Sequence, residues 1–112
     1  MDTSLDYKSL VKNILLEHAK LKPSYGEIEP HTLFDEAQED YVLIDIGWNG
    51  KRYVYGSVVH IQLINEKIWI HYDGTEDGVA TELVEAGVPK EDIVLGFRHP
   101  NVRQYTEFAT VV

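Results

Sequence analysis

The first part of the chain repeats apolar residues at the spacing of an amphipathic helix. This spacing predicts a helix over Thr3–Lys22. We expect Thr3 or Ser4 to cap its start and Asp6 to lie in its first turn, where the helix dipole favours a carboxylate. The side chains expected on its inward face are Tyr7, Leu10, Val11, Ile14, His18 and Leu21. We interpret His18 as a core or boundary residue rather than a ligand.

From residue 28 onward, apolar and polar residues alternate, which is typical of strands. The four strands predicted from this alternation are Ile28–Glu36, Tyr41–Trp48, Arg52–Ile64 and Lys67–Tyr72. Asn49-Gly50 is a strong signal for a two-residue hairpin turn, and Asn65-Glu66 is a weaker one. Because hairpin turns join antiparallel neighbours, the pattern predicts an antiparallel meander.

The two predicted turns determine which strand residues lie opposite each other. The first turn places Ile46 opposite Tyr53, and the second places His60 directly opposite His71. Continued alternation then gives one strongly apolar face, which we expect to be buried under the helices. Its predicted members are Val42, Ile44, Ile46, Tyr53, Tyr55, Val59, Ile61, Leu63, Ile68, Ile70 and Tyr72.

The opposite face of the predicted sheet mixes aromatic, aliphatic and polar side chains. It is too apolar for ordinary solvent-exposed surface, so we expect it to meet either the C-terminal segment of the chain or another subunit. The interface candidates on this face are Leu43, Val54, Val58, His60, Gln62, Trp69, His71 and Asp73.

The last third of the chain predicts a second helix and a further strand. Thr75 is the expected N-cap, Glu76 and Asp77 are expected in the first turn, and Gly87 is expected to end the helix. The apolar run Ile93–Phe97 then predicts a strand. The chain is therefore predicted to be a single α+β domain over residues 1–112. In it, a four-stranded antiparallel meander, which a fifth C-terminal strand can extend, carries two helices on one face.

Charge and composition narrow the function classes. Ten Lys and Arg residues stand against nineteen Asp and Glu residues, which gives a net charge of −9. Direct binding to nucleic acid is therefore not expected, and a basic protein is the more natural partner. The sequence shows neither a signal-peptide pattern nor a membrane-spanning apolar run, so we expect a cytoplasmic protein. Cysteine is absent, which excludes disulfide and thiol chemistry.

The histidine pair is the best candidate for chemistry. His60 and His71, with Asp73 nearby, could hold a divalent metal for a hydrolase, or could act in general acid–base catalysis. We favour the alternative, in which the histidines stack beside Trp69 at an interface. We therefore expect no catalytic residue, metal ligand or cofactor. The basic group Arg98, His99 and Arg103 is predicted either to contact a carboxylate-rich partner or to pair with the chain's own acids.

Long ordered stretches of the chain resemble a known family. They are KPSYGEIE, FDEAQEDYVLIDIGWNGKRYVYGSVVHI, KIWIHYDGTE, DGTEDGVATELVEAGVPKEDIVLGF and HPNVRQYTEFA. Together they resemble the XisI family of excision controlling factor proteins over nearly the whole chain.

The resemblance implies a role in site-specific DNA recombination. It implies control over removal of a DNA element during heterocyst differentiation in nitrogen-fixing, filamentous photosynthetic bacteria, together with an XisH-like partner and a recombinase. The family is not defined by catalytic residues, so we expect a non-enzymatic accessory protein that acts through protein–protein contacts. These contacts are expected with an XisH-like protein, with a second copy in a homodimer, or with both.

Overall fold

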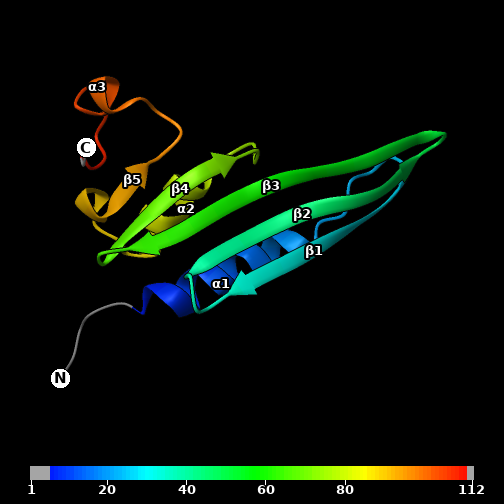
Figure 1. The fold of residues 1–112 in the computed structure, drawn as a ribbon, viewed down its shortest axis with the longest axis horizontal. Helices are drawn as coiled ribbons and strands as arrows, with labels where there is room; N and C mark the ends of the chain where they lie inside the picture. The colour runs from blue at the N-terminus through cyan, green and yellow to red at the C-terminus, as the bar shows by residue number, and fades with distance from the viewer. Residues whose placement is uncertain (1–5, 111–112) are drawn as a thin grey trace.

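A computed structural model describes residues 6–110 and shows one five-stranded sheet (Figure 1). The strands are β1 (Glu27–Asp35), β2 (Asp40–Asn49), β3 (Arg52–Ile64), β4 (Lys67–Asp73) and β5 (Ile93–Leu95). They lie in the order β1-β2-β3-β4-β5. The first four strands are antiparallel neighbours, whereas β5 pairs in parallel with β4. The predicted α+β meander with a fifth strand is confirmed.

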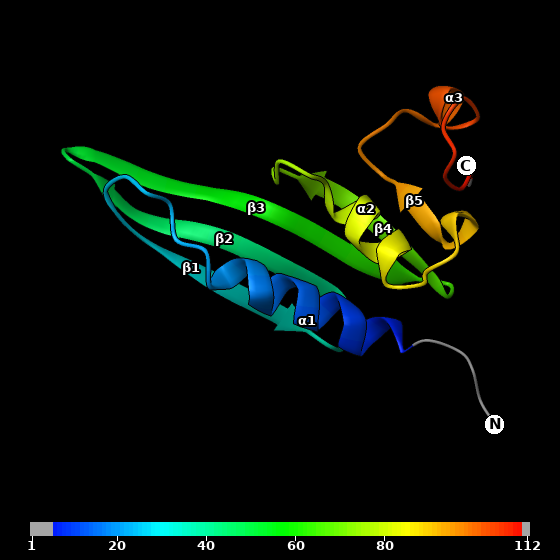
Figure 2. The ribbon, with the colours of Figure 1, turned by 180° about the vertical axis from the view of Figure 1, so that it is seen from behind.

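Two helices cover one side of the sheet, as Figure 2 shows from behind. They are α1 (Tyr7–Ala19) and α2 (Val79–Glu85), and two short helical segments follow, η1 (Lys90–Asp92) and α3 (Pro100–Arg103). No helix in residues 6–110 is long and apolar enough to cross a bilayer.

The helix α1 begins later than the helical spacing of apolar residues predicted. Asp6 is its N-cap rather than a first-turn residue, and its carboxylate accepts a hydrogen bond from the Ser9 amide at 3.3 Å. The predicted caps Thr3 and Ser4 lie outside the described residues. The helix ends at Ala19, one turn before Lys22.

The helix α2 also begins later than predicted. Gly78, with a φ of 88°, stands at the N-cap, so the prediction of a Thr75 cap is wrong. The reason is that Asp73 supplies the cap from outside the helix, accepting a hydrogen bond from the Val79 amide at 2.8 Å. Gly87 ends the helix with a φ of 104°, as predicted.

The turn between β2 and β3 lies one residue later than predicted. Asn49 pairs with Arg52, so the two central turn residues are Gly50 and Lys51, and Gly50 supplies the positive φ of 65°. As a result Ile46 lies opposite Tyr55 rather than Tyr53, a shift of two residues that leaves both on the same face of the sheet. The second predicted turn, at Asn65-Glu66, is confirmed, and both residues have positive φ.

Two β-bulges change which residues share a face. In β3, Val58 is an extra residue, because Leu43 pairs with Val59 while Ile44 pairs with Ser57. In β4, His71 is an extra residue. Each bulge reverses the alternation of side chains beyond it. The odd-numbered residues therefore face the helices in one half of β3 and the even-numbered residues in the other half. The predicted faces, which assumed unbroken alternation, are therefore wrong for part of the sheet.

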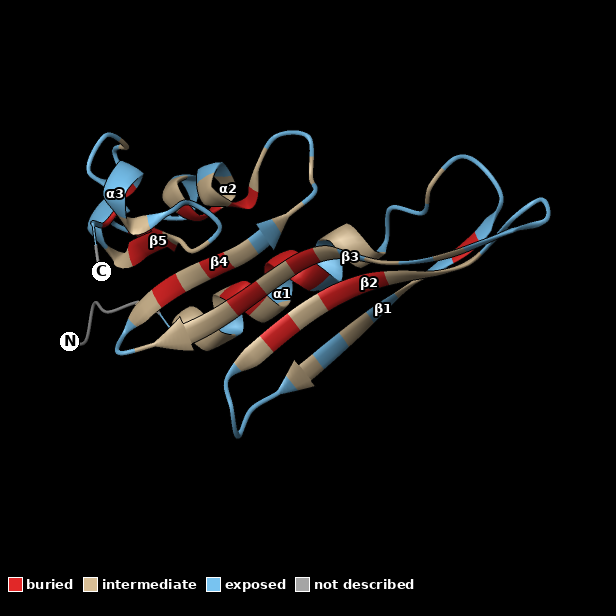
Figure 3. Cartoon of the chain, turned by 45° about the horizontal axis from the view of Figure 1, so that its top comes forward, coloured by how far each residue is buried: buried red, intermediate tan, exposed pale blue. Residues whose placement is uncertain are grey.

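The core lies between the sheet and the two helices. Buried sheet positions on the helix side gather along β2, β3 and β4, as Figure 3 shows. They are Tyr41, Leu43, Val59, Ile61, Ile68 and Ile70, and they pack against Val11, Ile14, Leu15, Val79 and Leu83. The residues wrongly predicted to be on this face are Val42, Ile44, Ile46, Tyr53, Tyr55 and Tyr72.

Candidate interaction face and helix-side hollows

The side of the sheet opposite the helices is here called the bare face. The strand pairings place on it Leu33, Val42, Ile44, Ile46, Trp48, Tyr53, Tyr55, His60, Gln62, Trp69, His71 and Tyr72. Several of its large side chains are open to solvent: Tyr55 is 67% exposed, Leu33 54% and Tyr72 50%, whereas Ile44 is 6% exposed. No helix in the described part of the chain lies over β1, β2 or β3 on this side (Figure 1). Over β1, β2 and β3 the bare face is thus a largely apolar surface that no helix covers.

The structure divides the predicted interface candidates equally between the two sides of the sheet. His60, Gln62, Trp69 and His71 lie on the bare face as predicted. The candidates on the helix side are Leu43, Val54, Val58 and Asp73. Leu43 is 2% exposed in the core. The extra residue in β3 accounts for Leu43, Val54 and Val58, and the extra residue in β4 accounts for Asp73.

A row of polar side chains crosses the bare face. The Nε2 atom of His60 lies 2.9 Å from Oδ1 of Asp40, and Nε2 of His71 lies 2.9 Å from Oε1 of Gln62. The two imidazole rings meet edge to face with their centroids 5.0 Å apart. Burial and the neighbouring His60 together lower the pKa of His71. The histidines are therefore in contact, although the bulge places Tyr72 rather than His71 opposite His60 in the ladder.

Asp73 does not join the two histidines. Its Oδ1 atom accepts hydrogen bonds from the amide and hydroxyl of Thr75 at 2.9 and 2.6 Å, and its Oδ2 atom accepts from Val79. Both carboxylate oxygens are thus used to organise the loop before α2. Among residues 6–110, no group of three or more His, Cys, Asp or Glu side chains could hold a metal ion. The constellation considered for a hydrolase is not assembled.

The C-terminal segment covers only the β4 end of the bare face. The guanidinium of Arg103 lies 5.2 Å from the Trp69 ring centroid, and its Nε donates to the carbonyls of Leu95 and Arg98. Arg103 is 5% exposed, so it holds the chain's own C-terminal segment rather than presenting a surface contact. The predicted cover by the C-terminal segment is thus found at the β4 end of the bare face, over Trp69.

The other two basic candidates stay exposed. Arg98 lies over the ring of Phe97, with 5.2 Å between the guanidinium carbon and the ring centroid. His99 caps α3, where its Nδ1 atom accepts a hydrogen bond from the Asn101 amide at 3.1 Å. Their predicted role as partner contacts stays a prediction.

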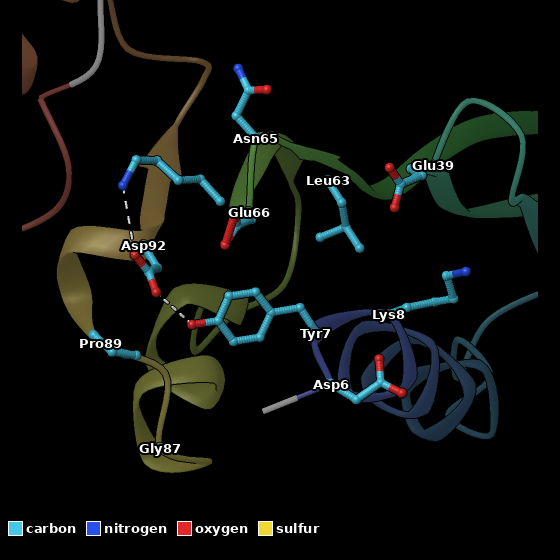
Figure 4. A pocket seen from close by; sticks show the side chains of 11 residues that line it. Asp6, Tyr7, Lys8, Glu39, Leu63, Asn65, Glu66, Gly87, Pro89 and Asp92 are labelled. Atoms are coloured by element: carbon cyan, nitrogen blue, oxygen red, sulfur yellow. Dashed lines mark hydrogen bonds and ion pairs between the residues drawn. The ribbon is translucent and has the colours of Figure 1, made fainter. Parts of the chain in front are cut away.

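A hollow with a volume of about 880 Å³ has internal contacts among the residues that line it (Figure 4). The Tyr7 hydroxyl donates to Asp92 at 2.6 Å, and Lys67 Nζ lies 3.6 Å from the same carboxylate. Burial and the Asp92 carboxylate raise the pKa of Tyr7 to about 12. These contacts tie the start of α1 to the entry of β5, so we interpret this hollow as structural.

A second hollow lies between α1 and α2 and is here called the helix-side groove. It has a volume of about 690 Å³ and is lined by His18, Leu21, Pro30, Leu43, Asp45, Val58, Thr75, Glu76, Asp77, Thr81, Glu82 and Glu85. His18 Nε2 lies 2.6 Å from Glu82 Oε2, which joins the two helices. Sequence reasoning missed this groove because its residues come from five separate segments of the chain.

Comparison with known proteins identifies the family. The family model described as XisI protein matches residues 1–110. The chain belongs to the XisI family. A search of curated proteins finds no match.

Two crystal structures of XisI-related proteins from Anabaena variabilis ATCC 29413 are similar to this chain. A XisI-like protein is 36% identical, with a TM-score of 0.87, and the match covers 94% of this chain and 96% of that protein. The fdxN element excision controlling factor XisI is 34% identical, with a TM-score of 0.79 and the same coverage. The XisI resemblance predicted from the sequence is therefore confirmed, together with the α+β fold.

Proposed function

We propose that this chain is a non-enzymatic accessory protein that takes part in controlling excision of a DNA element through protein–protein contacts. The excision role rests on similarity to the XisI-family relative described as an fdxN element excision controlling factor. The observation that carries the contact role is the bare face, where Tyr55, Leu33, Trp48, Tyr53 and Tyr72 are each at least half exposed. Contiguous apolar surfaces of this kind mark protein interaction sites.

The occupant of the bare face is a second copy of the chain. A chain with a net charge of −9 repels its own copy wherever acids face each other, so a weakly charged surface is the least costly place for two copies to meet. The bare face meets this requirement at its centre, where β2 and β3 carry aromatic and aliphatic side chains, whereas the acids Glu27, Glu29 and Asp35 lie along the edge strand β1. Lys67 pairs with Asp92, and Glu29 pairs with Lys22. A face that meets its own copy also suits a twofold symmetric dimer.

An XisH-like protein is the further partner that the family resemblance suggests. The acidic surface of the chain favours a partner with basic contact residues. In this proposal the dimer presents its remaining surfaces, including the exposed Arg98 and His99, to that partner.

Oligomeric state tests the self-association. We expect a dimer in analytical ultracentrifugation, and Tyr55→Glu or Leu33→Glu should shift it to monomer, because each places an acid in the apolar contact. Leu16→Glu is the matched control, since Leu16 is a 43% exposed apolar residue on α1. A monomeric wild-type protein, or a dimer unaffected by both face variants, contradicts the proposal.

Two further assays test the remaining parts. A pull-down with an XisH-like protein, repeated with Trp69→Ala and His71→Ala, tests the partner contact; both variants should bind as wild type does, and loss of binding in either would place that contact on the bare face. Calorimetry with zinc, manganese or magnesium tests the non-enzymatic assignment, and saturable metal binding would argue against it.

A further inference from the structure

We propose that the helix-side groove binds a basic amphipathic helix of a partner protein. This inference goes beyond the proposed function and concerns the opposite side of the sheet from the bare face. It rests on the charge, the apolar floor and the position of the groove.

The ionisable side chains of the groove are acidic, apart from one histidine. They are His18, Asp45, Glu76, Asp77, Glu82 and Glu85, and the lining contains neither Lys nor Arg. Only Glu82 has a partner, His18. The carboxylates of Asp45, Glu76, Asp77 and Glu85 have no hydrogen-bond or ion-pair partner among residues 6–110. The groove therefore presents unpaired negative charge that Lys or Arg side chains can neutralise.

Asp45 differs from the other acids because it lies within the sheet. It is partly buried on β2, and this burial raises the pKa of its carboxyl. A partly buried carboxylate loses hydration and here gains no ion pair in return. A cation brought to this position would restore the lost interaction, so Asp45 is the expected anchor for a basic side chain.

The floor and one edge of the groove are apolar. Leu43 and Val58 form part of the lining from the sheet, and Pro30 adds to it from β1. Leu21, just beyond the end of α1, is 71% exposed although it lines the groove. Apolar contacts below and acids around them match a helix with one apolar stripe flanked by basic residues.

The position of the groove favours a helical occupant. Residues of α1 and α2 form part of its lining, and the His18–Glu82 contact between the two helices fixes their spacing. An extended peptide needs the free hydrogen-bonding edge of a strand, but the edge strand β1 contributes only Pro30 to the lining, and proline has no N–H to donate. A helix satisfies its own backbone hydrogen bonds and requires only side-chain contacts, which this groove supplies.

A designed peptide tests this inference directly. The probe is a fluorescein-labelled amphipathic helix of about four turns built from Leu and Lys, and the control peptide has Glu in place of Lys. Fluorescence anisotropy measures binding to the full chain, and methyl NMR maps it. We expect the Lys peptide to bind, the Glu peptide not to bind, and the Leu43 and Val58 methyl signals to shift.

Matched charge variants separate the groove from general attraction to an acidic protein. Asp45→Asn combined with Glu85→Gln should weaken binding by about tenfold or more. Glu66→Gln combined with Glu91→Gln removes the same charge from exposed positions outside the groove and should change affinity by less than about threefold. A second variant, Glu76→Gln combined with Glu85→Gln, alters only exposed residues and keeps the test valid if Asp45→Asn disturbs folding.

The outcome is independent of the dimer. Tyr55→Glu should leave peptide affinity unchanged, because Tyr55 lies on the bare face. Equal loss of affinity in the groove pair and the control pair overturns the inference, as do methyl shifts confined to residues outside the groove.

Discussion

The two faces of the sheet carry similar apolar side chains but differ in what covers them. On the helix side, Ile61 and Ile70 are fully buried beneath α1 and α2, whereas on the bare face Leu33 and Tyr55 are more than half exposed. The difference therefore comes from the neighbouring elements rather than from residue type. The helix side of the sheet forms the core of the fold, and the bare face is available for binding.

The largest expected difference between the faces is in folding stability. Ile61→Ala leaves a cavity in the core and should lower the free energy of unfolding by about 2–5 kcal/mol. Tyr55→Ala removes an exposed ring and should lower it by less than about 1 kcal/mol. Urea unfolding at protein concentrations low enough to keep the chain monomeric measures both. An equally large loss for Tyr55→Ala would show that the bare face belongs to the monomer's own core.

The covered end of the bare face gives the next largest effect. Arg103→Ala removes the contact with Trp69 and the hydrogen bonds to two carbonyls, so it should cost about 1–3 kcal/mol. It should also shift Trp69 fluorescence to longer wavelength, measured in a Trp48→Phe background. The exposed Arg98→Ala is the control and should change stability by less than about 0.5 kcal/mol. An unshifted emission would mean that Arg103 does not shield Trp69.

The helix side should lose stability at high pH. The Tyr7 pKa is raised to about 12, so the folded chain holds this proton more tightly than the unfolded chain, whose value is 10.0. The corresponding stability is present below pH 10 and is lost as pH rises toward 12. Tyr7→Phe should cost about 1 kcal/mol near neutral pH and should flatten this loss relative to wild type. Tyr105→Phe, at an 82% exposed position, is the control and should do neither.

The bare face should respond in the opposite pH direction, with the smallest effect. The pKa of His71 is lowered from 6.5 in the folded chain, so the unfolded chain takes up the proton first as pH falls. The contribution is therefore present above pH 6.5 and is lost on acidification. His71→Gln should reduce this loss, whereas His31→Gln at an exposed position should not. Thermal unfolding between pH 7 and pH 5 measures the difference, and identical profiles would contradict it.

The sequence predicted the elements well because each depends on local signals. The period-two alternation identified the strands, Asn65-Glu66 identified a turn, and Gly87 identified the end of α2. The helix starts were less accurate since capping depended on tertiary contacts. Asp73, six residues before Val79, supplies the cap that Thr75 was expected to provide.

The faces of the sheet could not be predicted from alternation alone. The extra residue Val58 in β3 reverses which side chains face the helices, and that position itself is neither glycine nor proline in the sequence. Leu43, Val54 and Val58 consequently fall on the helix side, and the second bulge, at His71, turns Asp73 to that side as well. His60 and His71 still meet, with their ring centroids 5.0 Å apart. The helix-side groove lay beyond prediction for a different reason: Asp45 of β2 and Glu85 of α2 line the same hollow only once the helices have packed on the sheet.

The parallel pairing of β5 has a consequence for the order of folding. Strands β1 to β4 are joined by short turns, so their contacts close small loops and can form early. In contrast, Ile93 reaches its partner Ile68 only after α2 has crossed back along the sheet. We expect β5 and α3 to dock last and to open first. In hydrogen–deuterium experiments the amides of β5 should therefore exchange faster than those of the other strands.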